Sequence, residues 1–260
     1  MTQNAYRIIH GVSARRAFTL LVALALYPAA QAEAHDASDG GIKAESSSAV
    51  SAPFDIVHAR ITTDGNVATF HMAVSARAGT SKPTPSGQLA GSKVFSYVWP
   101  TSIDPYEVGF EHEAGILALA VTAHPDFDDT PLYDETGDGD PDNDGNLWHS
   151  HWVVLGPDDA CGDGALKVID IPEDANPRLP KTWPGLPILI DSPGWDPLID
   201  GETVELRVPF DDIGAVEAAS YDGVTAGLRV NASAHAPLLC VANVFDVASG
   251  DLSLPGKVNE

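Results

Sequence analysis

Short runs of β-branched and aromatic residues alternate along this chain with Gly, Pro and Asp, so few stretches are long enough for a helix. The runs lack the apolar period of 3.6 residues that an amphipathic helix needs, which excludes an α/β fold. Many short strands separated by turn residues are typical of β-sandwiches. We therefore predict one all-β domain over 53–260, an antiparallel β-sandwich of the Ig-like or jelly-roll type. Its ten expected strands cover 54–62, 67–76, 94–99, 115–123, 147–155, 165–171, 186–191, 203–209, 224–234 and 238–247.

The first two expected strands are joined by Asp64-Gly65, a dipeptide typical of two-residue hairpin turns. A turn at these residues places His58 directly opposite His71. Directly paired residues point to the same face of a sheet, with Cβ atoms about 5 Å apart. We therefore expect these two histidines to share one patch of sheet.

The N-terminus predicts export. The first 16 residues contain three arginines and no acidic residue, and an apolar run follows over 17–27 that is shorter than the roughly 20 residues needed to cross a bilayer. Small residues then allow cleavage after Ala32 or Ala34, so 1–32 is expected to be a cleavable signal peptide. An arginine pair before the apolar run leaves both the general secretory route and the twin-arginine route open. The mature protein is expected to be periplasmic or secreted.

The composition limits the partners of the mature chain. The formal net charge is −23, and three of the 14 basic residues belong to the predicted signal peptide. Nucleic acid and anionic membranes are therefore poor partners. A second apolar run long enough to span a membrane is missing from the sequence, so we expect no membrane insertion. Residues 33–52 are small and polar and are expected to form a flexible leader.

Two cysteines, Cys161 and Cys240, follow the predicted signal peptide. In an oxidising compartment the first expectation is one disulfide that closes a long loop. A cysteine-ligated metal is the alternative, but the chain has no CxxC or Cys-x-His spacing to support it.

The segment Leu147-Trp-His-Ser-His-Trp-Val-Val-Leu155 points to a transition metal. The spacing places His149 and His151 on one face of a strand, where two imidazoles can bind one ion. Leu147, Val153 and Leu155 fall on the same face, so the histidines are expected to be partly buried and to need a metal or hydrogen-bond partners. A hydrogen-bonded pair without metal remains the alternative.

The number of histidines strengthens the metal interpretation. If the strands carrying the two predicted pairs are neighbours, three or four imidazole nitrogens can meet, and such sites suit copper, zinc, iron or nickel. His124 enters a loop beside Asp126, which could orient an imidazole or bind the metal itself, and a capped turn explains this aspartate equally well. Cleavage after Ala34 would expose His35 as a terminal copper ligand. The candidate metal ligands are His58, His71, His124, His149 and His151, and His235 is expected to pack at a strand end.

An acidic segment runs directly into the second histidine pair. Alternating aspartates followed by Gly145 match the DxDxDG core of calcium loops, in which alternate oxygens surround the ion. Over about ten residues the segment resembles the calcium loops of EF-hand, dockerin and thrombospondin-type repeats. It departs from the EF-hand pattern at the twelfth position, where His151 stands in place of Glu, and no flanking helices are expected. A solvated acidic turn is the alternative. The candidate calcium ligands are Asp134, Asp138, Asp140, Asp142 and Asp144.

Together these patterns favour an exported metal-binding protein that sequesters or delivers copper first and zinc second. Two other binding functions stay open: a small-molecule or glycan site at Trp183 and Trp195, in a proline-rich stretch, and haem b in a DOMON-like sandwich. Haem would need Met72, which falls on the face opposite His71 and is expected in the core. The sequence lacks GxSxG, HExxH and glycine-rich phosphate motifs, but a metal-dependent oxidoreductase or hydrolase is a third possibility.

Overall fold

The computed structural model describes residues 40–231 and 237–260. The predicted signal peptide, its cleavage sites, His35 and His235 lie outside these residues. Each of the ten runs expected to form strands overlaps one strand of the structure. They are β2 (Ile56–Asp64), β3 (Val67–Val74), β4 (Lys93–Pro100), β5 (Ile116–Ala123), β6 (His149–Pro157), β7 (Leu166–Val168), β8 (Ile190–Asp191), β10 (Thr203–Pro209), β12 (Val224–Val230) and β13 (Leu239–Val247).

Four further strands are short and carry little apolar pattern. They are β1 (Ile42–Lys43), β9 (Leu198–Asp200), β11 (Ser220–Tyr221) and β14 (Gly256–Lys257). The described helices are also short: α1 (Ile213–Glu217) and the 3-10 turns η1 (Ala52–Phe54), η2 (Pro105–Val108) and η3 (Asp159–Cys161). None of these helices has the length and apolar character that a membrane span requires.

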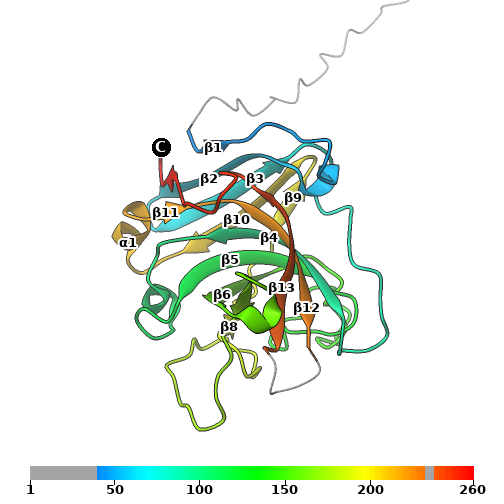
Figure 1. The fold of residues 1–260 in the computed structure, drawn as a ribbon. Coiled ribbons are helices and arrows are strands. Elements are labelled where there is room, and N and C mark those ends of the chain that lie inside the picture. The colour runs from blue at the N-terminus through cyan, green and yellow to red at the C-terminus, as the bar shows by residue number, and fades with distance from the viewer. Residues whose placement is uncertain (1–39, 232–236) are drawn as a thin grey trace, which may run out of the picture. The chain divides into compact units, whose positions relative to one another are not determined.

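The all-β antiparallel prediction is confirmed, but the sandwich is not. Five strands form an open sheet in the order β1-β2-β3-β10-β9. The larger sheet has the order β5-β4-β12-β13-β7-β6-β8, and β5 also pairs with β6, so six of its strands close into a barrel. Figure 1 shows the open sheet lying across the barrel. Turn and strand signals along the sequence do not reveal which strands pair at the two edges of a sheet. The closure by β5 and β6 was therefore not predicted.

Strand alternation creates two separate apolar cores. On β4, Tyr97 and Trp99 point out of the barrel and pack against the open sheet, whereas Val98 belongs to the cluster inside the barrel. On β5, Leu119 joins the outer core and Ala120 the inner one. Because β5 is buried on both faces, its sequence ILALAVTA is almost continuously apolar.

The hairpin between β2 and β3 turns one residue later than predicted. Asp64 pairs with Val67, so the turn residues are Gly65 and Asn66, and His58 lies opposite Ala73. Gly65 has φ of +59°, which suits the first central position of a type II′ turn. The register differs from the predicted one by two residues, and a shift of two leaves each side chain on its original face.

Part of the expected leader is ordered against the open sheet. Within 40–52, β1 pairs with β2 through Ile42 and Lys43. The buried carboxylate of Asp55 accepts hydrogen bonds from Ser46 Oγ at 2.8 Å and from the Ser47 amide at 2.9 Å. These bonds add to the limited apolar packing of the segment, to which Ile42 and Val50 contribute.

The predicted disulfide is present. Cys161, at the end of η3, is bonded to Cys240 on β13, and their Cα atoms are 5.4 Å apart. The bond spans 79 residues and ties the connection after β6 to the barrel wall.

Candidate metal centre

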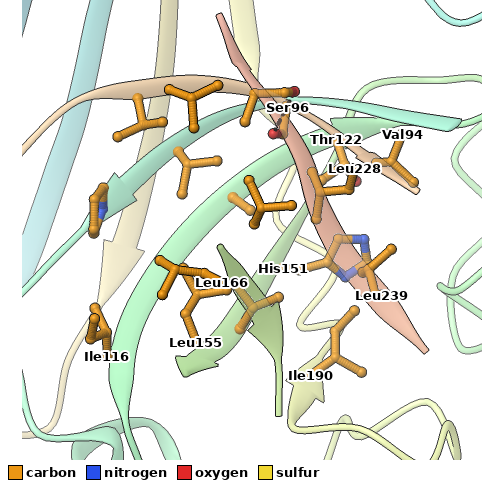
Figure 2. A pocket seen from close by; sticks show the side chains of 18 of the residues that line it. Val94, Ser96, Ile116, Thr122, His151, Leu155, Leu166, Ile190, Leu228 and Leu239 are labelled. Atoms are coloured by element: carbon orange, nitrogen blue, oxygen red, sulfur yellow. Dashed lines mark hydrogen bonds between the residues drawn. The ribbon is translucent and has the colours of Figure 1, made fainter. Parts of the chain in front are cut away.

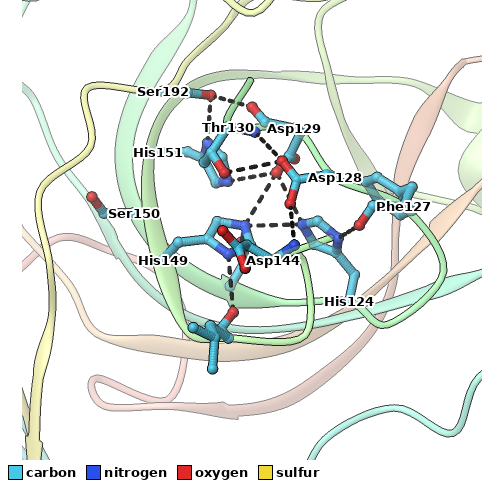
Figure 3. Close-up of polar contacts among 12 residues, drawn as sticks. His124, Phe127, Asp128, Asp129, Thr130, Asp144, His149, Ser150, His151 and Ser192 are labelled. Atoms are coloured by element: carbon cyan, nitrogen blue, oxygen red, sulfur yellow. Dashed lines mark hydrogen bonds and ion pairs between the residues drawn. The ribbon is translucent and has the colours of Figure 1, made fainter. Parts of the chain in front are cut away.

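One end of the barrel holds a cluster of three histidines and one aspartate (Figure 3). His149 and His151 lie on β6, and His149 is opposite Thr122 of β5 in the antiparallel ladder. His124 follows the last residue of β5, so the ladder brings it to the same end. Asp129 comes from the long connection between the two strands. All four side chains are buried.

The donor atoms converge on one point. Asp129 Oδ1 lies 3.1 Å from His124 Nε2, 3.1 Å from His149 Nε2 and 3.2 Å from His151 Nε2. The Nε2 atoms of His124 and His149 are 3.0 Å apart. Four donors held about 2.0–2.1 Å from a tetrahedral zinc ion are about 3.3 Å from one another. The cluster is therefore close to the spacing that a bound ion requires, and it could hold a metal ion.

A second layer of groups fixes the orientation of each imidazole. His124 Nδ1 lies 2.9 Å from the carbonyl oxygen of Phe127, and His149 Nδ1 lies 2.9 Å from that of Leu147. A carbonyl only accepts, so each Nδ1 carries the proton and each Nε2 is left as a donor atom for a metal. The ring of Phe127 also stacks on His124, with centroids 3.9 Å apart.

His151 is oriented by Ser192, which follows β8. Ser192 Oγ donates to the backbone oxygen of Asp129 at 2.6 Å, and His151 Nδ1 lies 3.1 Å from the same hydroxyl. The hydroxyl therefore accepts from the imidazole while it donates to the loop. Ser192 thus links Asp129, a candidate ligand on the loop, to His151, a candidate ligand on the strand.

Electrostatics at the centre favour a cation. Burial would raise the pKa of Asp129, but the neighbouring His124 and His151 hold it well below its usual range. Burial would lower the pKa of His124, but the charge of Asp129 raises it instead. For His149, burial prevails and lowers the pKa. A carboxylate among imidazoles that face it with Nε2 is a site in which a metal ion can take the place of a proton.

Two of the four donor atoms make no hydrogen bond in the described part of the chain. Asp129 Oδ1 and His151 Nε2 are buried without a hydrogen-bond partner, although they lie 3.2 Å apart. Leaving buried polar atoms unpaired is costly, and a metal ion between them would remove that cost. His149 Nε2 differs, because Thr122 Oγ1 lies 3.1 Å from it.

The acidic connection holds Asp129 in place. The Asp128 carboxylate accepts hydrogen bonds from the Thr130 amide at 2.8 Å and from the Asp144 amide at 2.9 Å. The second of these bonds joins two distant parts of the connection between β5 and β6. The backbone oxygen of Gly145 accepts a hydrogen bond from the His124 amide at 2.7 Å. A Cβ at Gly145 would lie 1.9 Å from the Phe127 oxygen, so the close approach requires glycine here.

The predicted calcium ligands are spread along this loop. Asp134 is used by the backbone: it accepts from the amides of Gly137, Asp138 and Gly139. Asp144 is buried and the Thr136 amide approaches its carboxylate at 3.3 Å. Within the described residues, the histidine cluster is the one group of three or more candidate ligands that come together closely. Calcium binding by the loop stays a prediction.

The four-histidine arrangement expected from the two pairs does not form. His58 and His71 lie on the open sheet, with ring centroids 5.8 Å apart, and His58 Nε2 is 2.8 Å from the Gly40 oxygen. His71 Nδ1 lies 3.6 Å from a Glu205 carboxylate oxygen. These strands pack on the outside of the barrel, so their outer faces cannot reach its interior. Met72 is fully buried in the outer core, as expected.

The two tryptophans considered for a glycan are engaged in packing. The Trp183 indole donates to the Leu186 oxygen at 2.9 Å and the ring packs against the barrel cluster. Trp195 contacts Trp152 edge to face, with centroids 6.5 Å apart. Both rings are half-buried, and a glycan at either stays a prediction.

Asp129 is the candidate ligand that sequence reasoning missed. In the run His124-Pro-Asp-Phe-Asp-Asp129, the sequence offers Asp126 as a partner of His124, but Asp126 is half-buried and accepts hydrogen bonds from the amides of Ser86 and Gly87 instead. Which of three aspartates turns inward depends on the path of the loop. The signal available in the sequence was the group of aspartates directly after a strand-end histidine.

Comparisons with protein-family models, curated proteins and solved structures found no match to this chain.

Proposed function

We propose that this protein binds one divalent transition-metal ion through His124, His149, His151 and Asp129. The observation that carries the proposal is the convergence of three buried Nε2 atoms on Asp129 Oδ1 at 3.1–3.2 Å. The Nδ1 atom of each imidazole has a hydrogen-bond partner that fixes the orientation of the ring. The donor atoms are therefore preorganised, and metal binding needs little rearrangement.

The donor set narrows the choice of metal. Imidazole nitrogen suits copper, zinc, iron and nickel, and one carboxylate keeps the site compatible with divalent ions. Soft thiolate and thioether ligands, which select Cu(I), are missing from the cluster. We propose copper as Cu(II) first and zinc second, because Cu(II) binds nitrogen and oxygen donors more tightly than the other divalent first-row ions.

We further propose that the protein works outside the cytoplasm, in sequestration or delivery of this metal. The support is the sequence of 1–32 together with the disulfide between Cys161 and Cys240, a bond typical of oxidising compartments. Cell fractionation with N-terminal sequencing of the mature chain tests this part. A chain that keeps residues 1–32 and stays in the cytoplasm would refute it.

The metal proposal is tested by elemental analysis and calorimetric titration of the purified mature protein with Cu(II) and Zn(II). We expect one equivalent of metal and loss of tight binding in His149→Ala. His112→Ala is the matched control, since His112 is exposed and stacks on Tyr106 away from the centre. Wild-type protein that fails to bind either metal would refute the proposal, and so would equal binding by His149→Ala.

We also propose a structural calcium ion in the acidic loop. Asp144 Oδ1 and Glu135 Oε1 are buried without hydrogen-bond partners in the described structure. Burial, and then the charges of Asp128 and Asp144, raise the pKa of Glu135. A calcium ion would satisfy these oxygens and brace the loop that carries Asp129. Thermal unfolding with and without a calcium chelator tests this, with a lower Tm expected after chelation in wild type and no change in Asp144→Asn.

A further inference from the structure

The barrel contains a cavity that reaches the metal centre. Its volume is about 340 Å³. His151 and Asp129 line one end, and Ile116, Val244 and Leu252, which are partly exposed to solvent, line it elsewhere. Figure 2 shows His151 projecting among the leucine and isoleucine side chains of the wall. The cavity therefore connects the surface with two of the four candidate metal ligands.

The space exists because small residues occupy the wall where larger ones would fill it. Ala120 on β5 and Ala226 on β12 both line the cavity. Ordinary protein cores contain few voids larger than a water molecule. A volume of about 340 Å³ instead falls in the range of about 300–1,000 Å³ found for small-molecule sites.

The wall suits an apolar ligand better than water. Its polar side chains among the described residues are Ser96, Thr122, Asp129 and His151, and the rest are mostly aliphatic. The Ser96 hydroxyl already donates to the Ala226 oxygen at 3.0 Å. A buried water needs two to four polar partners, which most of this wall cannot supply. The polar groups that remain are gathered at the metal end.

The segment after β13 adds a constraint at the cavity. Leu252 and Leu254 both line it, and both have left-handed backbone conformations, with φ of +59° and +53°. Such φ values are costly for leucine and persist where the surrounding structure imposes them. Here they turn two leucines toward the cavity.

From this arrangement we propose that the barrel cavity binds a small, mainly apolar molecule with one oxygen donor, and that this donor points to the metal beside His151 and Asp129. The orientation of the ligand rests on the proposed metal function, but occupation of the cavity does not. A metal with five or six coordination positions keeps at least one free after binding the four protein donors. The aliphatic wall then holds the rest of the ligand.

The test uses p-cresol and p-xylene, which have nearly the same shape but differ in one hydroxyl. Binding to the mature protein is measured by calorimetry and ligand-observed NMR, with and without bound Co(II) as a spectroscopic stand-in for the metal. We expect both to bind with Kd below about 1 mM. Only p-cresol should shift the visible bands of the Co(II) protein.

Variants locate the binding. Ala226→Trp fills the cavity and should weaken p-xylene binding by about tenfold or more. Val98→Trp enters the same space from β4 and replaces it if Ala226→Trp does not fold. Ala49→Trp, at an exposed position far along the chain from the barrel strands, is the control and should leave binding unchanged.

The outcomes separate the two proposals. If the wild type fails to bind p-xylene, or if both filling variants bind it as well as wild type, the cavity site is refuted whatever the metal does. If p-xylene and p-cresol bind the cavity but the Co(II) bands do not change with p-cresol, the orientation toward the metal is refuted. If Co(II), Cu(II) and Zn(II) all fail to bind, the proposed metal function fails, while p-xylene binding still decides the cavity.

Discussion

Asp129 Oδ1 lies 3.2 Å from His151 Nε2, yet neither atom has a hydrogen-bond partner among the described residues. A buried carboxylate and imidazole nitrogen this close are satisfied either by a proton on the imidazole or by a metal ion between them. The carboxylate comes from a loop and the imidazole from a strand, so whatever binds there also fastens the loop to the barrel.

Replacing Asp129 with Asn should abolish tight metal binding while preserving the shape of the side chain. The amide loses the negative charge and offers a weaker donor, so we expect affinity for Zn(II) or Cu(II) to fall by about 100-fold or more. Asp126→Asn is the matched control, because Asp126 lies in the same loop but accepts from Ser86 and Gly87. Calorimetric titration measures both, and equal affinities in the two variants would contradict the assignment.

Ser192→Ala removes the hydroxyl that orients His151 and leaves all four candidate metal ligands in the sequence. Loss of such a group typically lowers metal affinity by about 10–100-fold. Ser150→Ala is the control, since the Ser150 hydroxyl is also buried but donates to the Trp195 oxygen. Competition with a chelator of known affinity measures the difference. Unchanged affinity in Ser192→Ala would show that the hydroxyl does not position the imidazole.

Gly145→Ala should disturb both the loop and the centre. The new Cβ would fall 1.9 Å from the Phe127 oxygen and 2.8 Å from His124 Nδ1, so the loop must move away from the metal. Gly137→Ala in the same loop is the comparison: its Cβ meets no atom within 4 Å, and its left-handed φ costs only about 1–2 kcal/mol. We expect metal binding to survive in Gly137→Ala and to weaken in Gly145→Ala. Similar metal affinity in both would argue against a close-packed loop.

The paired change Cys161→Ser with Cys240→Ser should lower the free energy of unfolding by about 2–5 kcal/mol, as expected for the loss of a bond that closes a long loop. Metal binding should persist, because neither cysteine contributes a candidate ligand. Urea unfolding of metal-free protein gives the stability change, and titration of the folded variant gives the metal stoichiometry. A folded variant without metal would link the disulfide to the centre.

Asp55→Asn tests the anchoring of the segment before β2. Burial would raise the pKa of Asp55, but hydrogen bonds from Ser75, Ser47 and Ser46 lower it. A lowered pKa in the folded state adds stability above the unfolded value of about 3.9, and this contribution is lost as the pH falls further. Wild type should therefore be more stable than Asp55→Asn at pH 7, with the difference shrinking below about pH 4. Urea unfolding at several pH values measures this, and a constant difference would contradict it.

The sequence alone predicted ten of the described strands and three of the four candidate ligands. Period-two alternation placed His149 and His151 on one face with Val153 and Leu155, and the structure has His151, Val153 and Leu155 lining the same cavity. Strand positions follow from local residue preferences and turn residues, which act over a few positions. The pairing of Cys161 with Cys240 also followed, because only two cysteines exist.

Only the tertiary structure decided how distant segments meet. Pairing of β5 with β6 closes the barrel, brings His124 to His149 and separates both from His58 and His71. The choice of Asp129 over Asp126 depends on the path of a loop braced by Asp128 and Gly145. Contacts of this kind depend on chain closure and packing across many residues, and local residue patterns carry no record of them.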